Sequence, residues 1–275
     1  MTAVLDRPAP SADRPPPDWW PDDLPNPRTL SREGAVQALF DAGELTAMEF
    51  HLLYDRTPPG FKAELIEGKV YVASPVSGGH SGPHLNFTFP INLFRAETHG
   101  VAGGIDQTAT LEGAGEAQPD LFLRVRLDHG GRVGTWNLVD DQRVPAGDDG
   151  DFLDAGPEFV LEVARSTLRR DLGAKRRDYA RGGVREYVVA DVRAERLVWY
   201  DLADDPATAR DLPADGVLRS SAMPGLWLDG AALFAGDLAA VRAASDAGLA
   251  SPEHAAFAAK LAAARDARAA AAGDA

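Results

Sequence analysis

The sequence contains no cysteine, and this absence removes several kinds of chemistry. Without thiols the chain has no disulfides, no thiolate nucleophile and no zinc site of the cysteine type. No apolar run approaches the roughly 20 residues of a membrane-spanning helix. The start, MTAVLDRPAPSADRPPP, has acid and proline where an export signal has basic and then apolar residues. We therefore expect a soluble, cytoplasmic protein that makes no contact with a membrane.

Positive charge is also scarce, because 28 lysines and arginines stand against 42 acids, giving a formal net charge of −14. Such a charge repels nucleic acid at long range, which argues against a protein that coats DNA without specificity. A nuclease is still compatible with it, since a local basic patch and a metal ion can offset the field where a phosphate docks.

Composition divides the chain into three parts. Residues 1–28 are rich in proline and aspartate, and we expect them to be disordered or loosely docked. Residues 29–235 carry strand and helix patterns, with a glycine- and aspartate-rich stretch at about 128–156 that predicts a long insertion or mobile loop outside the core. Residues 236–275 are alanine-rich, which predicts a peripheral or partner-binding helix that ends in a frayed tail.

Changes of hydrophobic period predict the elements of the central part. Ser31 is a candidate N-cap for a helix in EGAVQALFDAGEL, and AELIEGKVYVAS alternates on both sides of a Glu-Gly turn as a β-hairpin does. A helix is expected over residues 80–99, with Leu85 and Phe94 on its apolar face. Strands follow in QPDLFLRVRL, EFVLEVA, VREYVVADV and ERLVWYDL, and a helix in DLGAKRRDYARGG. The expected fold class is mixed α/β, with a β-sheet core flanked by helices.

Two carboxylates on these strands predict a metal site. Glu162 lies in the middle of FVLEVA, where a charge is costly unless it is paired or bound to a metal. Asp120 opens another strand directly after Pro119, and adjacent strands can bring two such acids together at a sheet edge. Mg²⁺ prefers one or two carboxylates together with waters and phosphate oxygens.

A lysine on the following helix is a third candidate. Lys175 shares a helix face with Leu172 and Tyr179. Its ammonium either points inward, where it could position water or neutralise a phosphate, or reaches the surface and pairs with Asp171 or Asp178. The sequence leaves both orientations open.

Three further features each have two interpretations. Glu64 alternates with Ala63 and Leu65, and a solvent-facing strand residue is the ordinary interpretation. His80 and His84 have the i, i+4 spacing of zinc ligands, but without an HExxH motif His80 more simply lies at a cleft rim or caps the helix. A basic cluster either contacts a nucleic-acid backbone or is solvated helix charge, and its members are Arg165, Arg169, Arg170, Arg176 and Arg177.

The segments FKAELIEGKVYVASP, QPDLFLRV and PEFVLEVARSTLRRDLGAKRRDYARGGVREYVVADVRAERLVWYDL resemble, in this order, the Uma2 (DUF820-type) family in the PD-(D/E)xK nuclease superfamily. The similarity covers roughly residues 45–235. It implies a restriction-endonuclease-like mixed sheet flanked by helices, with a metal-dependent site that hydrolyses phosphodiesters.

The resemblance also implies roles for single residues. Asp120 is similar to the family's metal aspartate, Glu162 to its second acid and Glu64 to the upstream acid of ELIEG. The superfamily's lysine is expected two residues after Glu162, where Ala164 stands. Lys175 matches the position on the following helix to which Uma2-like sequences move it.

The activity so implied is Mg²⁺-dependent endonuclease cleavage of DNA, with Mn²⁺ able to substitute. Asp120 and Glu162, with the Val163 carbonyl, would hold the ion, and Lys175 would orient the attacking water. Glu64 would hold a metal-bound water or a second ion. Tyr179 and Ser166 line the site, or else Tyr179 only packs and Ser166 only caps a helix. The alternatives are RNA or structured nucleic acid as the substrate, and a non-catalytic binding or scaffold protein that retains the fold. The resemblance further implies a homodimer.

Overall fold

The computed structural model describes residues 15–73 and 78–273. Its first elements are two short helices with the expected caps. α1 (Arg32–Asp41) begins where the Ser31 hydroxyl accepts a hydrogen bond from the Gly34 N–H, and α2 (Ala47–Tyr54) begins with a capping box between Thr46 and Glu49. Both helices pack in one hydrophobic cluster with the buried Trp20.

Of the two alternatives for the N-terminal segment, disordered or loosely docked, its described part is docked. Residues 15–28 contain turns but neither helix nor strand, and Trp20, which is 6% exposed, fixes them to α1 and α2. Residues 1–14 lie outside the described part of the chain.

Seven strands form the first sheet, in the order β2-β1-β5-β4-β9-β7-β8. The hairpin of β1 and β2 is as predicted, and Glu67 and Gly68 at its turn have φ of 50° and 72°. The strand bounds are β1 (Ala63–Ile66), β2 (Lys69–Val72), β4 (Ala109–Thr110), β5 (Glu116–Ala117), β7 (Thr135–Val139), β8 (Gln142–Gly147) and β9 (Phe152–Leu153).

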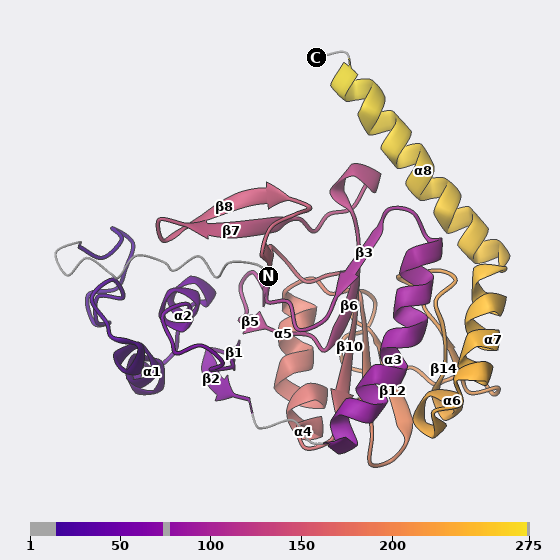
Figure 1. The fold of residues 1–275 in the computed structure, drawn as a ribbon, viewed down its shortest axis with the longest axis horizontal. Coiled ribbons are helices and arrows are strands. Elements are labelled where there is room, and N and C mark those ends of the chain that lie inside the picture. The colour runs from indigo at the N-terminus through magenta and orange to yellow at the C-terminus, as the bar shows by residue number, and fades with distance from the viewer. Residues whose placement is uncertain (1–14, 74–77, 274–275) are drawn as a thin grey trace.

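Three of these strands come from residues 128–156, so the prediction of a mobile loop outside the core is wrong. Trp136 is fully buried, and its ring lies 4.8 Å from that of Phe152. The glycines and aspartates serve tight turns instead, since Asp140 and Asp141 connect β7 to β8 with positive φ. The β7–β8 ribbon extends from the body in Figure 1.

Five strands form the second sheet, in the order β12-β11-β10-β6-β3. Their bounds are β3 (Val101–Gly104), β6 (Leu121–Val125), β10 (Phe159–Ala164), β11 (Glu186–Asp191) and β12 (Arg196–Asp201). Every residue of β10 and β11 is buried, as the nearly continuous apolar run in β10 predicts for a strand covered on both faces. The mixed α/β fold class is thus confirmed.

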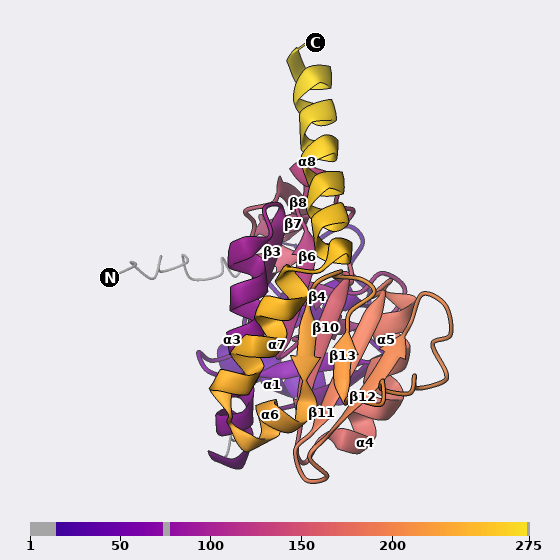
Figure 2. The same ribbon diagram turned by 90° about the vertical axis from the view of Figure 1, so that its right-hand side faces the viewer.

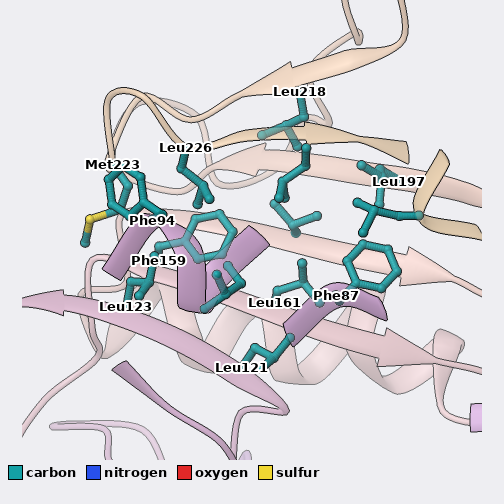
Figure 3. Packing of buried hydrophobic residues seen from close by; sticks show 14 of the residues in the cluster. Phe87, Phe94, Leu121, Leu123, Phe159, Leu161, Leu197, Leu218, Met223 and Leu226 are labelled. Atoms are coloured by element: carbon teal, nitrogen blue, oxygen red, sulfur yellow. The ribbon is translucent and has the colours of Figure 1, made fainter. Parts of the chain in front are cut away.

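Helices cover both faces of the second sheet (Figure 2). α3 (Gly78–Glu97), α6 (Gly230–Ala235) and α7 (Leu238–Leu249) lie on one face, and α4 (Leu168–Arg170) and α5 (Arg176–Arg181) on the other. Because strand side chains alternate, Phe159 and Leu161 of β10 join the core against α3, shown in Figure 3. Leu85, predicted on the apolar face of α3, is 70% exposed, because Phe87, Ile91 and Phe94 form that face.

The alanine-rich end of the chain is helical, as expected, and also has a packing role. α7 packs on β14 (Trp227–Asp229), which pairs with β13 (Val217–Arg219). α8 (Pro252–Gly273) contacts the short 3-10 helix Leu127–His129 and then projects beyond the body (Figure 1). Within the described ranges, no helix has the length and apolar character needed to span a bilayer.

Candidate active site

Two acids lie at neighbouring positions of the second sheet, Glu162 within β10 and Asp120 directly before β6. The antiparallel pairing of β10 with β6 joins Leu161 to Leu121, so one step further along the strands Asp120 lies opposite Glu162. Asp120 Oδ2 accepts a hydrogen bond from the Val163 N–H at 2.7 Å. The register therefore brings together the two acids that the sequence singled out.

Lys175 enters the same site from a distorted helix. After β10 the chain forms α4, then the π-helical segment Asp171–Lys175, then α5. A π-helical segment widens the turn locally, and the Tyr187 hydroxyl donates a hydrogen bond to the Asp171 carbonyl within it. Lys175 is 2% exposed, and its Nζ lies 2.7 Å from Glu64 Oε1 and 2.8 Å from Glu162 Oε1. Of the two orientations that the sequence left open, the inward one is observed.

Glu64 reaches this site from β1 of the first sheet. Its Oε1 accepts hydrogen bonds from Lys175 and, at 2.9 Å, from the Gln118 N–H, and Arg170 lies 3.6 Å from its Oε2. Its side chain is only 13% exposed. The interpretation of Glu64 as a solvent-facing strand residue is therefore wrong, because strand alternation cannot show that a second sheet and a helix close over that face.

Burial and mutual charge decide the protonation of these groups. Burial raises the pKa of Glu162 well above its usual value, and although Lys175 opposes this, the Asp120 and Asp171 carboxylates raise it further. Burial alone would lower the pKa of Lys175, but Glu162 and Glu64 raise it above its usual value, so the amine stays an ammonium. Burial also acts to raise the pKa of Glu64, which Lys175 nevertheless holds below its usual value.

Tyr179 of α5 fixes the Glu162 carboxylate. Its hydroxyl donates a hydrogen bond to Glu162 Oε1 at 2.7 Å. Burial, followed by the nearby Glu162 charge, raises the pKa of Tyr179 well above its usual value, so the phenol remains a neutral donor. Tyr179 therefore both packs in the core and belongs to the site.

The site opens onto a cleft of about 540 Å³ between the two sheets, α3 and α4, and Tyr179 is not among the residues that line it. The candidates Glu64, Asp120, Glu162 and Lys175 all line it. Ser166 also lines the cleft and does not cap a helix, because Thr167 occupies the N-cap position of α4.

Three other residues that line the cleft had little or no signal in the sequence. Gln118 holds Glu64 through its N–H, Arg170 approaches the same carboxylate, and His84 Nε2 lies 3.1 Å from the Asp120 carbonyl. In the sequence, Arg170 was noted as a member of the basic cluster and His84 as a member of a histidine pair, whereas Gln118 was not noted as a site residue. The side chain of His80 lies outside what the structure describes, so the zinc interpretation stays a prediction.

The predicted basic cluster is divided among three places. Arg165 and Arg170 line the cleft. Arg176 lies over the Tyr200 ring, and Arg177 pairs with Glu67 of the hairpin turn. Arg169, the fifth member of the cluster, is exposed, and contact of these arginines with a nucleic-acid backbone stays a prediction.

The chemistry of the donor set suits a divalent ion at Asp120 and Glu162. Among the described residues no group of three or more histidine, cysteine or acidic side chains is arranged to hold a metal. Mg²⁺ needs fewer protein ligands, because it commonly binds through one or two carboxylates and completes its shell with water and phosphate oxygens. Two carboxylates that line one cleft fit that requirement.

Comparisons with known proteins point to nucleases. The family model Uma2, described as "Putative restriction endonuclease", matches residues 47–231, well over half of the chain. A crystal structure of a putative nuclease belonging to DUF820 from Anabaena variabilis ATCC 29413 has a similar fold, with a TM-score of 0.52 and 16% sequence identity. The similarity covers 69% of this chain and 99% of that chain. No curated protein matches the chain.

Proposed function

Because the chain belongs to the Uma2 family of putative restriction endonucleases, we propose that it hydrolyses phosphodiester bonds of DNA with the help of Mg²⁺ or Mn²⁺. One observation carries the proposal. Side chains from β1, β10, the residue before β6 and the π-helical segment converge in a single cleft, with the Lys175 ammonium 2.7 and 2.8 Å from two carboxylates. A structural role alone gives no reason to leave such a buried charge cluster open to solvent on one side.

Asp120 and Glu162 are the proposed metal ligands, helped by the Val163 carbonyl. A bound ion would polarise the phosphate and lower the pKa of a water molecule. Tyr179 fixes the direction of the Glu162 carboxylate by its hydrogen bond, which reduces the cost of reorganising the site during the reaction.

Lys175 is the proposed group that positions water and neutralises the phosphate. Its pKa is raised, so it donates hydrogen bonds and does not act as a general base at neutral pH. Glu64 holds the ammonium in place from the opposite side, and Gln118 holds Glu64. In this scheme Glu64 and Gln118 act through Lys175 and not on the phosphate itself.

The proposal is tested by cleavage of plasmid and single-stranded DNA with Mg²⁺ or Mn²⁺ and with EDTA. Asp120→Asn should lower the rate by 10²-fold or more, on the order of what a lost charge-stabilising group costs. Asp266→Asn, on the exposed part of α8 at 69% exposure of its side chain, is the matched control and should cleave normally. Unchanged cleavage by Asp120→Asn would exclude the proposed site.

Two alternatives have distinct outcomes. Cleavage of RNA but not DNA would keep the site and change the substrate. If neither is cleaved and Mn²⁺ binding is absent in both the parent and Glu162→Ala, the chain is a binding or scaffold protein that retains the nuclease fold. The implied homodimer is checked separately by light scattering.

A further inference from the structure

Three aliphatic side chains stand exposed around the candidate cleft. Val72 at the end of β2 is 41% exposed, Leu85 of α3 is 70% exposed and Ile105 after β3 is 50% exposed, and all three line the cleft. We call them the apolar lip. Figure 1 shows β2 and the first turns of α3 on either side of α4. Large apolar side chains usually occur singly on a protein surface, so three at the opening of one charged cleft indicate a binding role.

The charges of the cleft lining argue against a site that grips an intact duplex. Among the described residues, the lining has four acids and four bases, the bases being Lys62, Arg165, Arg170 and Lys175. Lys62 pairs with Asp106 at 3.4 Å, and Arg170 lies 3.6 Å from Glu64 Oε2. Binding to duplex DNA draws most of its affinity from the neutralisation of several phosphates. A cleft lining with equal numbers of acids and bases, in a chain of net charge −14, neutralises few phosphates.

The burial of Glu162 and Lys175 also argues against an intact duplex as the substrate. Glu162 is 4% exposed and Lys175 is 2% exposed, so a phosphate must enter the cleft past the apolar lip to reach them. In a stacked duplex the groups beside the phosphate are sugars and further phosphates, and phosphates lose hydration against aliphatic side chains. An unstacked nucleotide instead offers the apolar face of its base, and proteins use aliphatic side chains as wedges beside such bases.

From these observations we infer that the apolar lip receives the base of an unpaired nucleotide next to the scissile phosphate. The substrate class of the site is then single-stranded or locally unpaired DNA. This inference rests on the proposed nuclease function, since it concerns the same cleft. Leu85 and Ile105 then determine the preference for unpaired DNA, because they contact the base. The charged residues contact the phosphate.

The test is binding of short fluorescent DNA to the full chain, followed by anisotropy. All proteins carry Asp120→Asn so that cleavage does not interfere, and the probes are one single strand and the same sequence as a duplex. The lip variant is Leu85→Ala with Ile105→Ala. The control is Val139→Ala with Leu238→Ala, which removes side chains of 49% and 46% exposure that do not line the cleft.

We expect the parent and the control to bind the single strand more tightly than the duplex. The lip variant should bind the single strand about tenfold more weakly, as expected for the loss of contacts to one base, with duplex binding unchanged. A further set of probes consists of single strands that each lack one base at a different position. The parent should bind one of these strands about tenfold more weakly than the complete strand, and the lip variant should bind all of them equally. Circular dichroism and thermal melting confirm that the variants fold.

The inference is overturned if the lip variant binds both probes as the parent does, or loses the same factor for both. Its failure differs from failure of the proposed function, which is measured by cleavage with Asp120 intact. Cleavage without a preference for the single strand refutes only the role of the lip. A preference that depends on the lip, without cleavage, supports the binding role and refutes the nuclease.

Discussion

Lys175→Met replaces a buried ammonium by an apolar side chain of similar length and should destabilise the protein strongly. Lys175 is 2% exposed and lies within 2.8 Å of carboxylate oxygens from Glu64 and Glu162, which would remain buried without their cation. Removal of one partner from a buried ion pair costs about 3–5 kcal/mol. At roughly 2–4 °C per kcal/mol for a chain of this size, the melting temperature should fall by roughly 6–20 °C.

The loss should depend on pH in a defined direction. The pKa of Glu162 is raised by burial, so Glu162 is the first of the two acids to be protonated as the pH falls. The pKa of Glu64 is lowered in the folded protein, so its pairing with Lys175 stabilises the parent above the unfolded pKa of a glutamate and is lost as the pH falls through the folded value. Both effects make the difference between parent and Lys175→Met largest at neutral pH and smaller in acid.

The measurement is thermal or urea unfolding followed by circular dichroism at several pH values. The double variant Lys175→Met with Glu162→Gln removes one of the two stranded charges and should recover part of the lost stability. Unfolding of Lys175→Met at the parent's temperature would refute the reasoning, and so would a double variant less stable than the single one. Cleavage assays on the same proteins separate the loss of activity from the loss of fold.

Three further predictions follow from the site and the fold. Tyr179→Phe removes the hydrogen bond to Glu162 Oε1 and should cost about 1 kcal/mol in urea unfolding while slowing cleavage roughly tenfold; an unchanged rate would mean that this bond does not orient the carboxylate. Trp136→Ala should cost about 3–5 kcal/mol, because the side chain is fully buried, whereas a loss below about 0.5 kcal/mol would show that residues 128–156 do not belong to the core. Mn²⁺ affinity, measured by titration calorimetry, should increase from pH 5 to pH 8, since the raised pKa of Glu162 makes protons compete with the ion; affinity independent of pH would contradict Glu162 as a ligand.

Local patterns were sufficient for most elements of the second sheet. The run FVLEVA reads as a strand covered on both faces because six buried positions follow one another, and the Glu162 charge in its middle already demanded a partner. The β1–β2 hairpin was likewise visible, because alternation and the Glu-Gly turn are properties of neighbouring residues.

The prediction for residues 128–156 was wrong, because their position depends on contacts between segments far apart in the chain. The stretch 128–156 was expected outside the core because its glycines and aspartates are typical of loops, yet Trp136 is buried between strands and packs against His51 and Phe152. Composition reports the turns of such a ribbon, whereas its place in the core depends on segments outside 128–156, because Trp136 contacts His51 of α2 and β9 pairs with β4.

The sequence by itself determined which residues carry charge within apolar strands, and so which acids were candidates for chemistry. Only the tertiary structure decided how they meet: the register of β6 against β10 sets Asp120 opposite Glu162, a π-helical segment turns Lys175 inward, and a strand of another sheet adds Glu64. The physical reason is the distance along the chain over which each interaction acts. Side-chain periodicity follows from the backbone over a few residues, whereas register, helix placement and burial come from contacts between segments far apart in the chain.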